Sequence, residues 1–149
     1  MTTEPATEVA REAWELLFRV AKAKHGILTV RLAELDLTPV QAHALRRLDP
    51  ERPLAMSALA EALYCHASNV TGIVDRLESR GLVERTPGID DRRVKTLVLT
   101  PEGAEVRAHV IELLSEPPAA LAALPAADQQ ALLDILRRAF ADEITTVTP

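Results

Sequence analysis

The chain has 149 residues and a formal net charge of −5, and it is 48% hydrophobic, 26% charged and only 3% aromatic. This composition is ordinary for a globular protein with one core, and a core built from Leu, Val, Ile and Ala favours an α-rich fold. It excludes a membrane span, because no run of 18 apolar residues occurs, and it excludes a uniformly basic nucleic-acid binder.

Apolar residues recur at helical spacing over the first part of the chain. From about residue 7 to residue 35 their period predicts one long amphipathic helix, with a bend at Gly26. Thr38-Pro39 predicts the start of a second helix, because threonine caps a helix and proline fits its first position. Asp49-Pro50 predicts the end of that helix.

Two shorter helices follow, joined by a tight turn. The first is predicted to begin after Ser57 and the second near Ser68, and Gly81 predicts where the second one ends. The second helix carries an apolar stripe at positions i, i+3, i+4 and i+7, made of Val70, Ile73, Val74 and Leu77.

The period then changes from helical to extended. Residues 82–86 and 94–99 are rich in β-branched side chains and predict two strands, with residues 87–93 as a polar hairpin tip. Thr100-Pro101 predicts another helix that runs to about Glu116, where two prolines break it. A last helix is predicted from about residue 126 to residue 143.

This order of elements predicts a mainly α fold with a two-stranded β wing. Two short helices joined by a tight turn and followed by a hairpin form a recurring DNA-reading unit, the winged helix-turn-helix. We therefore expect a single domain over residues 1–149. Its DNA-binding lobe would occupy about residues 38–103, and its dimerisation helices about residues 5–35 and 104–145.

The predicted helix near Ser68 carries small polar side chains opposite its apolar stripe. At about 100° per residue, the opposite face consists of Ser68, Gly72, Asp75 and Ser79, with Asn69, Thr71 and Arg76 at its flanks. Such side chains reach base edges in a major groove, Gly72 permits close approach of the backbone, and Arg76 is placed for a phosphate. The alternative is an ordinary solvated helix face.

The hairpin tip carries two adjacent arginines. Arg92 and Arg93 suit a narrow, negative minor groove, and Asp91 can orient one of them through a bidentate pair. A charged tip alone can equally be a solvated turn, but the preceding helix-turn-helix favours DNA contact. Segment 52–95 has seven basic and six acidic side chains, against ten and sixteen in the remainder. We interpret this asymmetry as a division of function along the chain.

At these residues the chain resembles the MarR-type regulators (multiple antibiotic resistance regulators). Residues 68–85, SNVTGIVDRLESRGLVER, are similar to the recognition helix and first wing strand of that family. DRR at 91–93 and LVLTPEG at 97–103 are similar to its wing and to the start of its next helix. The resemblance is strongest from about Leu54 to Gly103, and the helix order extends it to nearly the whole chain.

The resemblance implies a homodimeric, sequence-specific transcriptional regulator of double-stranded DNA. It would be a repressor on a pseudo-palindromic operator, released by a small-molecule effector. By this resemblance Ser68, Asn69 and Thr71 would read bases, Arg76 would contact a phosphate, and Arg93 would enter the minor groove with Asp91 orienting it. Gly72 and Arg92, argued from the residues above, complete the candidate DNA-binding residues.

The two ends of the chain carry wide apolar faces. They consist of Trp14, Leu17 and Phe18 near the N-terminus and of Leu132, Leu133, Leu136 and Phe140 near the C-terminus. Any one of these residues could be core, but as a set they favour an obligate dimer. A dimer would also separate two recognition helices by about 34 Å, the spacing of successive major grooves.

The resemblance further implies a pocket for a small aromatic or phenolic ligand between the dimerisation helices and the DNA-binding lobe. The candidate residues for this effector pocket are Trp14, Phe18, His25, His43, Arg46 and Tyr64. Each of them can instead be a packing residue or a solvated polar group, and no pattern identifies the ligand.

Other functions find little support in the sequence. We expect no enzyme activity, cofactor or metal, because nucleophile motifs, phosphate loops and ligand-spaced clusters are absent. Cys65 is interpreted as a small buried residue, although a redox role stays open. One cysteine and an N-terminus without a signal-peptide pattern favour the cytoplasm. The acidic net charge favours one alternative, a winged-helix protein-interaction module that does not bind DNA directly.

Overall fold

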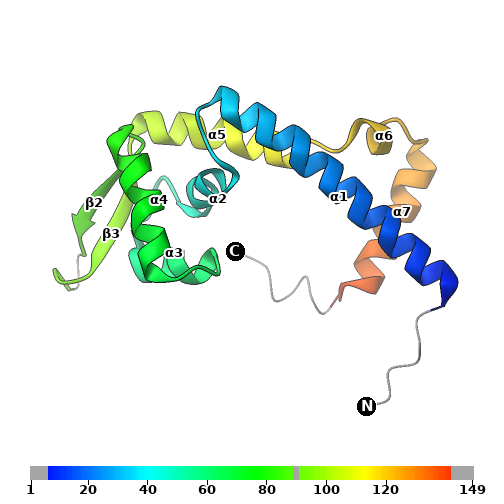
Figure 1. Cartoon of the computed structure of the whole chain (residues 1–149), viewed down its shortest axis with the longest axis horizontal. Helices are drawn as coiled ribbons and strands as arrows, with labels where there is room; N and C mark the ends of the chain where they lie inside the picture. The colour runs from blue at the N-terminus through cyan, green and yellow to red at the C-terminus, as the bar shows by residue number, and fades with distance from the viewer. Residues whose placement is uncertain (1–6, 89–90, 142–149) are drawn as a thin grey trace, which may run out of the picture. The chain divides into compact units, whose positions relative to one another are not determined.

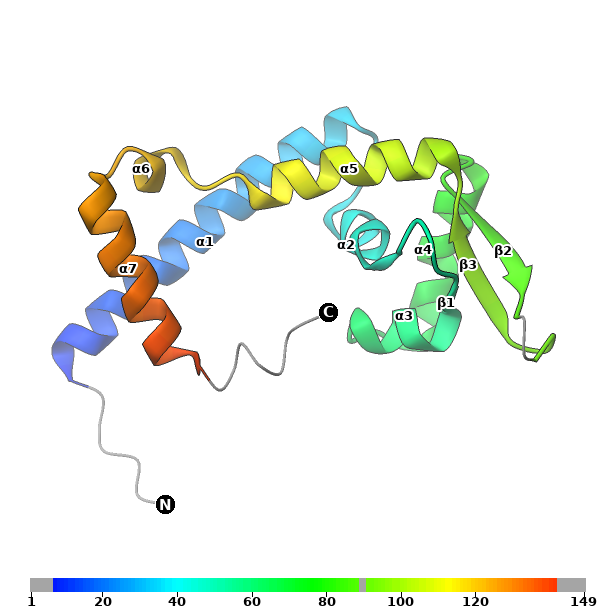
Figure 2. The same cartoon turned by 180° about the vertical axis from the view of Figure 1, so that it is seen from behind.

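The computed structural model of the chain describes residues 7–88 and 91–141. They fall into two compact units, a first that ends at Ser115 and a second that begins at Glu116. Figures 1 and 2 show the elements from opposite sides. No helix in the described part of the chain combines the length and the apolar character needed to cross a membrane.

The first two helices begin and end close to where the sequence predicts. Helix α1 spans Glu8–Glu34, is capped by the hydroxyl of Thr7, and continues through Gly26 without interruption. Helix α2 spans Pro39–Arg47 and begins with a capping box. There Thr38 Oγ1 accepts from the Gln41 backbone N–H at 3.3 Å, and Gln41 Oε1 accepts from the Thr38 N–H at 2.9 Å.

The predicted start of the third helix after Ser57 is wrong. Strand β1 (Leu54–Ala55) immediately precedes helix α3 (Met56–Ala62), so that Ala55 is the N-cap residue and Ser57 lies inside the helix. Helix α4 spans Ala67–Ser79 and agrees with the prediction within one residue at each end. Its predicted stripe is confirmed, because Val70, Val74 and Leu77 are buried and Ile73 is partly buried.

The predicted hairpin is present, but the sheet has a third strand. Strands β2 (Val83–Pro87) and β3 (Lys95–Leu99) pair antiparallel, with Val83 opposite Leu99 and Pro87 opposite Lys95. Strand β1 pairs with the other edge of β3, which gives the order β1-β3-β2. The sequence did not predict β1, because two residues are too short to show an alternating pattern.

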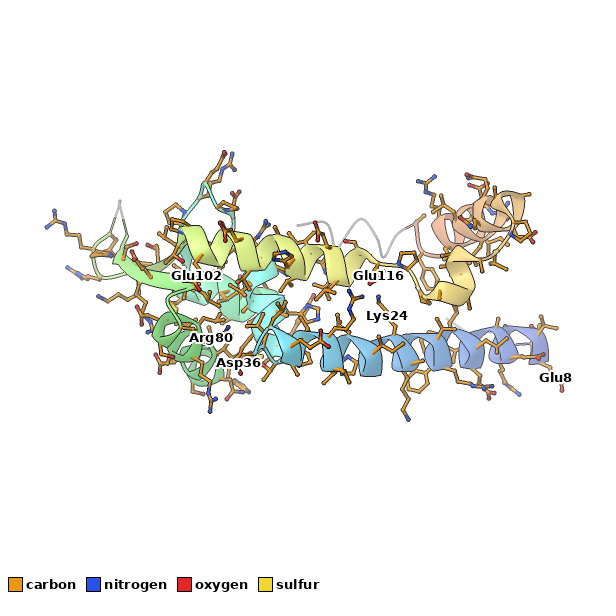
Figure 3. All side chains as sticks on the ribbon, turned by 90° about the horizontal axis from the view of Figure 1, so that it is seen from above. Glu8, Lys24, Asp36, Arg80, Glu102 and Glu116 are labelled. Atoms are coloured by element: carbon orange, nitrogen blue, oxygen red, sulfur yellow. The ribbon has the colours of Figure 1, made fainter. Side chains whose placement is uncertain are left out.

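Helix α5 (Pro101–Ser115) starts at the end of β3 as predicted. Thr100 Oγ1 accepts from the Gly103 N–H at 2.9 Å and donates to the Gly81 carbonyl at 2.6 Å. Gly103 packs so closely on the Leu82 carbonyl that a Cβ there would overlap it. Farther along, Lys24 of α1 donates to the Leu113 carbonyl of α5 at 3.4 Å (Figure 3).

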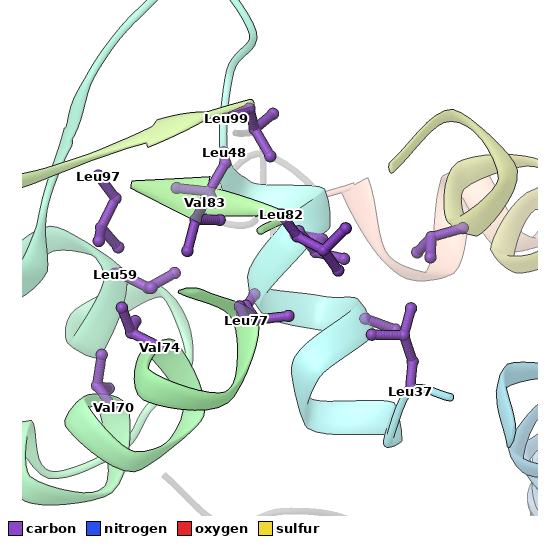
Figure 4. Close-up of a cluster of buried hydrophobic side chains, with 14 of the residues drawn as sticks. Leu37, Leu48, Leu59, Val70, Val74, Leu77, Leu82, Val83, Leu97 and Leu99 are labelled. Carbon is purple, nitrogen blue, oxygen red and sulfur yellow. The ribbon is translucent and has the colours of Figure 1, made fainter. Parts of the chain in front are cut away.

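One aliphatic core holds these elements of the first unit together. It contains leucine, valine and alanine side chains from α1 to α5 and from the sheet, and the leucines and valines labelled in Figure 4 belong to it. As the composition predicted, none of these core residues is aromatic. Only the C-terminal part of α1 enters this core, through Leu28 and Leu32.

Three helices of the first unit end in the same backbone motif. After α1, α3 and α4, the next-but-one residue adopts a left-handed conformation, with φ of 54° at Asp36, 50° at Tyr64 and 70° at Gly81. In each case its N–H and the N–H that follows bond back to the helix, as in Tyr64 N to Glu61 O and Cys65 N to Ala60 O. These are Schellman caps, and only the one at Gly81 was predicted.

The described part of the second unit, residues 116–141, contains two helices. Helix α6 (Ala119–Ala122), which was not predicted, precedes helix α7 (Ala126–Ala139). The Gln129 side chain donates to the carbonyls of Ala122 at 3.1 Å and Leu124 at 2.8 Å. No described residue of this unit is fully buried, and the predicted helix end at residue 143 lies outside the described residues.

The contact between Gly103 and Leu82 generates a prediction. Gly103→Ala should lower the free energy of unfolding by about 3 kcal/mol, because the new methyl group can be accommodated only by moving backbone. Gly26→Ala is the matched control, because nothing lies within 4 Å of its Cβ position. It should raise that free energy by about 0.5–1 kcal/mol. Urea denaturation measures both, and equal effects would contradict the packing described.

Candidate nucleic-acid interface

Helix α4 presents its predicted polar residues to solvent. Ser68, Asn69, Thr71, Gly72 and Arg76 are all exposed, while the opposite stripe is buried in the core. Thr71 Oγ1 donates to the Ala67 carbonyl at 3.1 Å, so that its hydroxyl keeps only acceptor capacity for a partner. Nothing lies within 4 Å of the Cβ position of Gly72, so that the helix surface is open there.

Arg85 connects this helix to the hairpin, a contact that sequence reasoning missed. Its guanidinium, on β2, forms an ion pair with Asp75 at 2.5 Å and a second one with Glu78, both on α4. Its backbone N–H also donates to the Glu78 carboxylate at 3.1 Å. The side chain of Arg85 is 22% exposed and that of Asp75 is 59% exposed, so the guanidinium is largely covered while the Asp75 carboxylate stays open to solvent.

The bridge changes the electrostatics of the predicted polar face. Partial burial alone would lower the pKa of Arg85, but hydrogen bonds and charges of Asp75 and Glu78 outweigh it and raise that pKa above its ordinary value. The guanidinium therefore stays charged, and its single positive charge offsets part of the negative charge of the two acids. Beside this bridge, Arg76 is an exposed cation on α4, and the neighbouring carboxylate of Asp75 is paired with Arg85.

The hairpin tip exposes its two arginines and is closed by backbone hydrogen bonds. Arg92 and Arg93 are exposed, and the Gly88 N–H donates to the Val94 carbonyl at 2.8 Å. Asp91 Oδ1 accepts from the Arg93 backbone N–H at 2.9 Å. The carboxylate thus holds the Arg93 backbone and not its guanidinium, in place of the predicted bidentate pair. The tip residues Ile89 and Asp90 lie outside the described residues.

The helix and the hairpin lie side by side. Strand β2 returns along α4 after the Gly81 cap, so that the hairpin tip lies toward the same end of the unit as the beginning of α4 (Figures 1 and 2). A cleft of about 550 Å³ lies over the exposed part of α4 and is bordered by α2. It is lined by Asn69, Gly72 and Arg76 together with Gln41 and Cys65.

A second cleft, of about 480 Å³, lies where α4 meets the turn between α1 and α2. Arg76 and Arg80 line it together with Thr38 and Gln41. Arg80 donates to the backbone carbonyls of Leu35 at 2.9 Å and Asp36 at 2.5 Å, and its Nε lies 3.7 Å from the Asp36 carboxylate (Figure 3). The C-terminal end of α4 is therefore fastened to the end of α1.

The six effector-pocket candidates are only partly brought together. His43 on α2 lies close enough to His25 on α1 and to Arg46 for their charges to affect it. Trp14 and Phe18 lie on the exposed N-terminal half of α1. Tyr64 lies in the turn between α3 and α4 and is 92% exposed. None of the six lines either of the two clefts described above.

Of the predicted dimerisation residues, those on α1 and Leu133 on α7 are exposed in the single chain, and the others are partly buried. On α1, Trp14 is 61% exposed and Phe18 is 59% exposed, and Leu17 is also exposed. On α7, Leu133 is exposed and Leu132 and Leu136 are partly buried. These last two line a cleft of about 500 Å³ in the second unit, together with Leu121 of α6. The apolar faces therefore lack a full cover within either unit.

Comparison with known sequences places the middle of the chain in one family. Residues 37–95 match the model of the MarR family. In Bacillus subtilis, the uncharacterised HTH-type regulator YfiV is 31% identical over 64% of this chain and 60% of its own length. The repressor MdtR is 42% identical over 45% of this chain and 43% of its own length. The HTH-type regulator YsmB is 31% identical over 74% of this chain and 75% of its own length. The matches to YfiV and MdtR thus span less than two thirds of those proteins.

Solved structures of similar fold cover more of the chain. AbsC, a MarR family transcriptional regulator from Streptomyces coelicolor, superposes with a TM-score of 0.72 at 25% identity, over 97% of this chain and 99% of that one. A mutant of S. aureus MepR bound to an oligodeoxyribonucleotide superposes with a TM-score of 0.64 at 23% identity, over 86% and 96%. The latter likeness shows the fold alone.

The Arg85 bridge generates a stability prediction. Arg85→Gln should lower the free energy of unfolding by about 1–3 kcal/mol, because it leaves two carboxylates without their charged partner. Arg92→Gln, at the exposed tip, should change it by no more than about 0.5 kcal/mol. Urea denaturation at fixed pH compares the two, and a neutral Arg85→Gln would contradict a structural bridge.

His43 generates a prediction about pH. Partial burial and then the positive charges of Arg46, Arg47 and His25 lower the pKa of His43. The His43 imidazole therefore binds a proton more tightly in the unfolded chain than in the folded one. Above about pH 6.5 His43 is neutral in both states and folding carries no penalty from it. As the pH falls below that value, the unfolded chain takes up the proton first and the free energy of unfolding decreases. In His43→Gln the melting temperature should fall less between pH 7.5 and pH 5 than in the parent protein. Parallel curves would contradict the assignment.

Proposed function

Because the chain belongs to the MarR family of winged-helix, DNA-binding transcriptional regulators, we propose that it acts as a homodimeric repressor on a pseudo-palindromic operator in double-stranded DNA. The observation that carries this proposal is the exposed polar half of α4 beside an arginine-tipped hairpin, with Arg85 joining the two. One of the relatives, MdtR, is named a transcriptional repressor, which supports repression over activation.

In this proposal the beginning of α4 enters the major groove. Ser68, Asn69 and Thr71 contact base edges, and the asparagine amide can pair with adenine at two atoms. Gly72 lets the helix backbone approach the DNA, since no side chain stands out from the helix there. Arg76 binds a backbone phosphate and positions the helix in the groove.

The hairpin tip contacts the neighbouring minor groove. Arg92 and Arg93 are exposed cations at the end of a ribbon, which suits the negative potential of a narrow minor groove. The hydrogen bond from the Arg93 N–H to Asp91 fixes the backbone from which the arginine extends. The bridge formed by Arg85 keeps this tip at a constant position relative to α4.

The net charge of −5 is compatible with this surface. Asp75 and Glu78 are the acids of α4, and both are paired with Arg85. Much of the acidic excess lies outside segment 52–95, in residues that the proposal assigns to dimerisation. The alternative function, a protein-interaction module without DNA binding, is favoured only by the overall charge, and the DNA-binding test below separates the two.

Dimerisation would cover the exposed apolar faces. Trp14 and Phe18 on α1 expose more than half of their surface, which is costly for large apolar side chains in a monomer. We assign dimerisation to about residues 5–35 and 104–145 and DNA binding to about residues 38–103. Two copies related by a twofold axis would then match two half-sites one helical turn apart, about 34 Å.

A small aromatic or phenolic anion is the effector that we propose. His25, His43 and Arg46 gather between α1 and α2, where Arg46 supplies a positive charge and the two imidazoles supply hydrogen-bonding nitrogens, and Trp14 and Phe18 supply aromatic surface on the same long helix. Tyr64 is left out of this site, because the turn that carries it joins α3 to α4. Binding would relieve repression by favouring a spacing of the α4 helices that does not fit the operator.

The wing generates a prediction for DNA binding. Arg92→Ala combined with Arg93→Ala should weaken binding to a duplex selected by the parent protein at least tenfold, because two cations leave the minor groove. The slope of log affinity against log salt should also become shallower. Fluorescence anisotropy across a salt series measures both quantities. Unchanged affinity in a folded double variant would favour the protein-interaction alternative.

The exposed face of α1 generates a prediction for assembly. Phe18→Asp should convert the dimer to monomer at micromolar concentration, because the charge would be buried in the interface. Ala23→Asp, on the opposite side of the helix, should leave the dimer intact. Sedimentation velocity distinguishes the two states. A parent protein that sediments as a monomer would contradict the proposed assembly.

A further inference from the structure

Tyr64 is a tyrosine where the backbone favours glycine. It is 92% exposed, and its φ of 50° is left-handed, a conformation that bulky L residues adopt only under strain. Its N–H and the N–H of Cys65 form the Schellman bonds to Glu61 and Ala60, and these bonds involve the backbone only. Glycine could make the same bonds without strain.

The other two Schellman caps have residues that tolerate the left-handed conformation. Gly81 occupies the position after α4, where glycine removes the steric penalty. Asp36 occupies it after α1, and short polar side chains tolerate this conformation better than aromatic ones. In addition, the Asp36 carbonyl and carboxylate interact with Arg80. Tyr64 has neither advantage, since its side chain is almost fully solvated and does not pack in the core.

The position of Tyr64 between α3 and α4 places its side chain where a docked DNA backbone would pass. It lies in the turn of the helix-turn-helix, three residues before Ala67, the first residue of α4. Three residues span no more than about 11 Å, so the ring lies near the end of α4 that carries the exposed Ser68 and Asn69. When such a motif docks, the second helix enters the major groove and the first helix crosses the sugar-phosphate backbone. The turn between them therefore lies over the backbone.

We infer that the Tyr64 hydroxyl donates a hydrogen bond to a DNA phosphate beside the half-site read by α4. This inference rests on the proposed function and extends it to a residue outside α4 and the hairpin. Tyrosine hydroxyls are among the donors that bind phosphate oxygens and so set the register of a protein on the duplex. The strained cap holds the phenol outside the fold, where it contributes to binding and not to stability.

The test compares stability with DNA binding in the same variants. Tyr64→Gly should raise the melting temperature by roughly 2–4 °C and still weaken binding about three- to tenfold. Tyr64→Phe should show most of the same loss of DNA affinity, but its melting temperature should equal that of the parent protein, because only the hydroxyl is removed. The probes are a duplex selected by the parent protein and a mixed-sequence duplex. A phosphate contact weakens binding to both, and the salt slope stays constant because no counterion is released.

Gly26→Ala is the control, because it also changes stability through the backbone alone and lies on α1, outside the DNA-binding lobe, with nothing within 4 Å of its Cβ position. It should leave DNA affinity within about twofold. Parent-like affinity in Tyr64→Gly or Tyr64→Phe would overturn the inference and leave the proposed function standing. A Tyr64→Gly protein that melts lower than the parent would overturn the strain argument. A parent protein that binds neither duplex would contradict both the proposed function and this inference.

Discussion

The charged bridge between strand β2 and helix α4 determines the rest of the arrangement. Arg85 reaches back from the strand to Asp75 and Glu78, two acids one helical turn apart. One side chain therefore holds the polar helix and the arginine-tipped hairpin together, and its single positive charge offsets part of the negative charge of the two acids that a polyanion would otherwise meet. Electrostatic partners placed this way contribute more to specific geometry than to net stability.

Local chemistry made most of the helices predictable. The caps of α1 and α2 depend on residues within three or four positions of the helix start, and the buried stripe of α4 depends on its own period. Strand β1 was not predictable in this way, because Leu54 and Ala55 are extended only by pairing with Leu97 and Thr96 of β3. Helix α6 is a single turn, which is too short to show a period.

The candidate site was predictable in composition but not in its contacts. The exposure of Asn69 and Arg76 follows from helix geometry, whereas the bridge of Arg85 crosses a corner between a helix and a strand, and no sequence spacing encodes it. The effector candidates were chosen by residue type, which carries no information about depth in the fold. Tyr64 was grouped with His43 for this reason, although one lies in the turn after α3 and the other on α2.

The start of α5 packs against the segment that joins α4 to β2 through main-chain contacts. Gly103 rests directly on the Leu82 carbonyl, and Thr100 donates a hydrogen bond to the carbonyl of Gly81, the left-handed residue of the cap after α4. A rotation of α5 cannot be absorbed by side-chain rearrangement there, because the touching surfaces are main chain. The start of α5, the cap after α4 and the start of β2 are therefore joined through main-chain contacts, so that a shift of α5 at this corner would have to move the Leu82 backbone or break the hydrogen bond of Thr100.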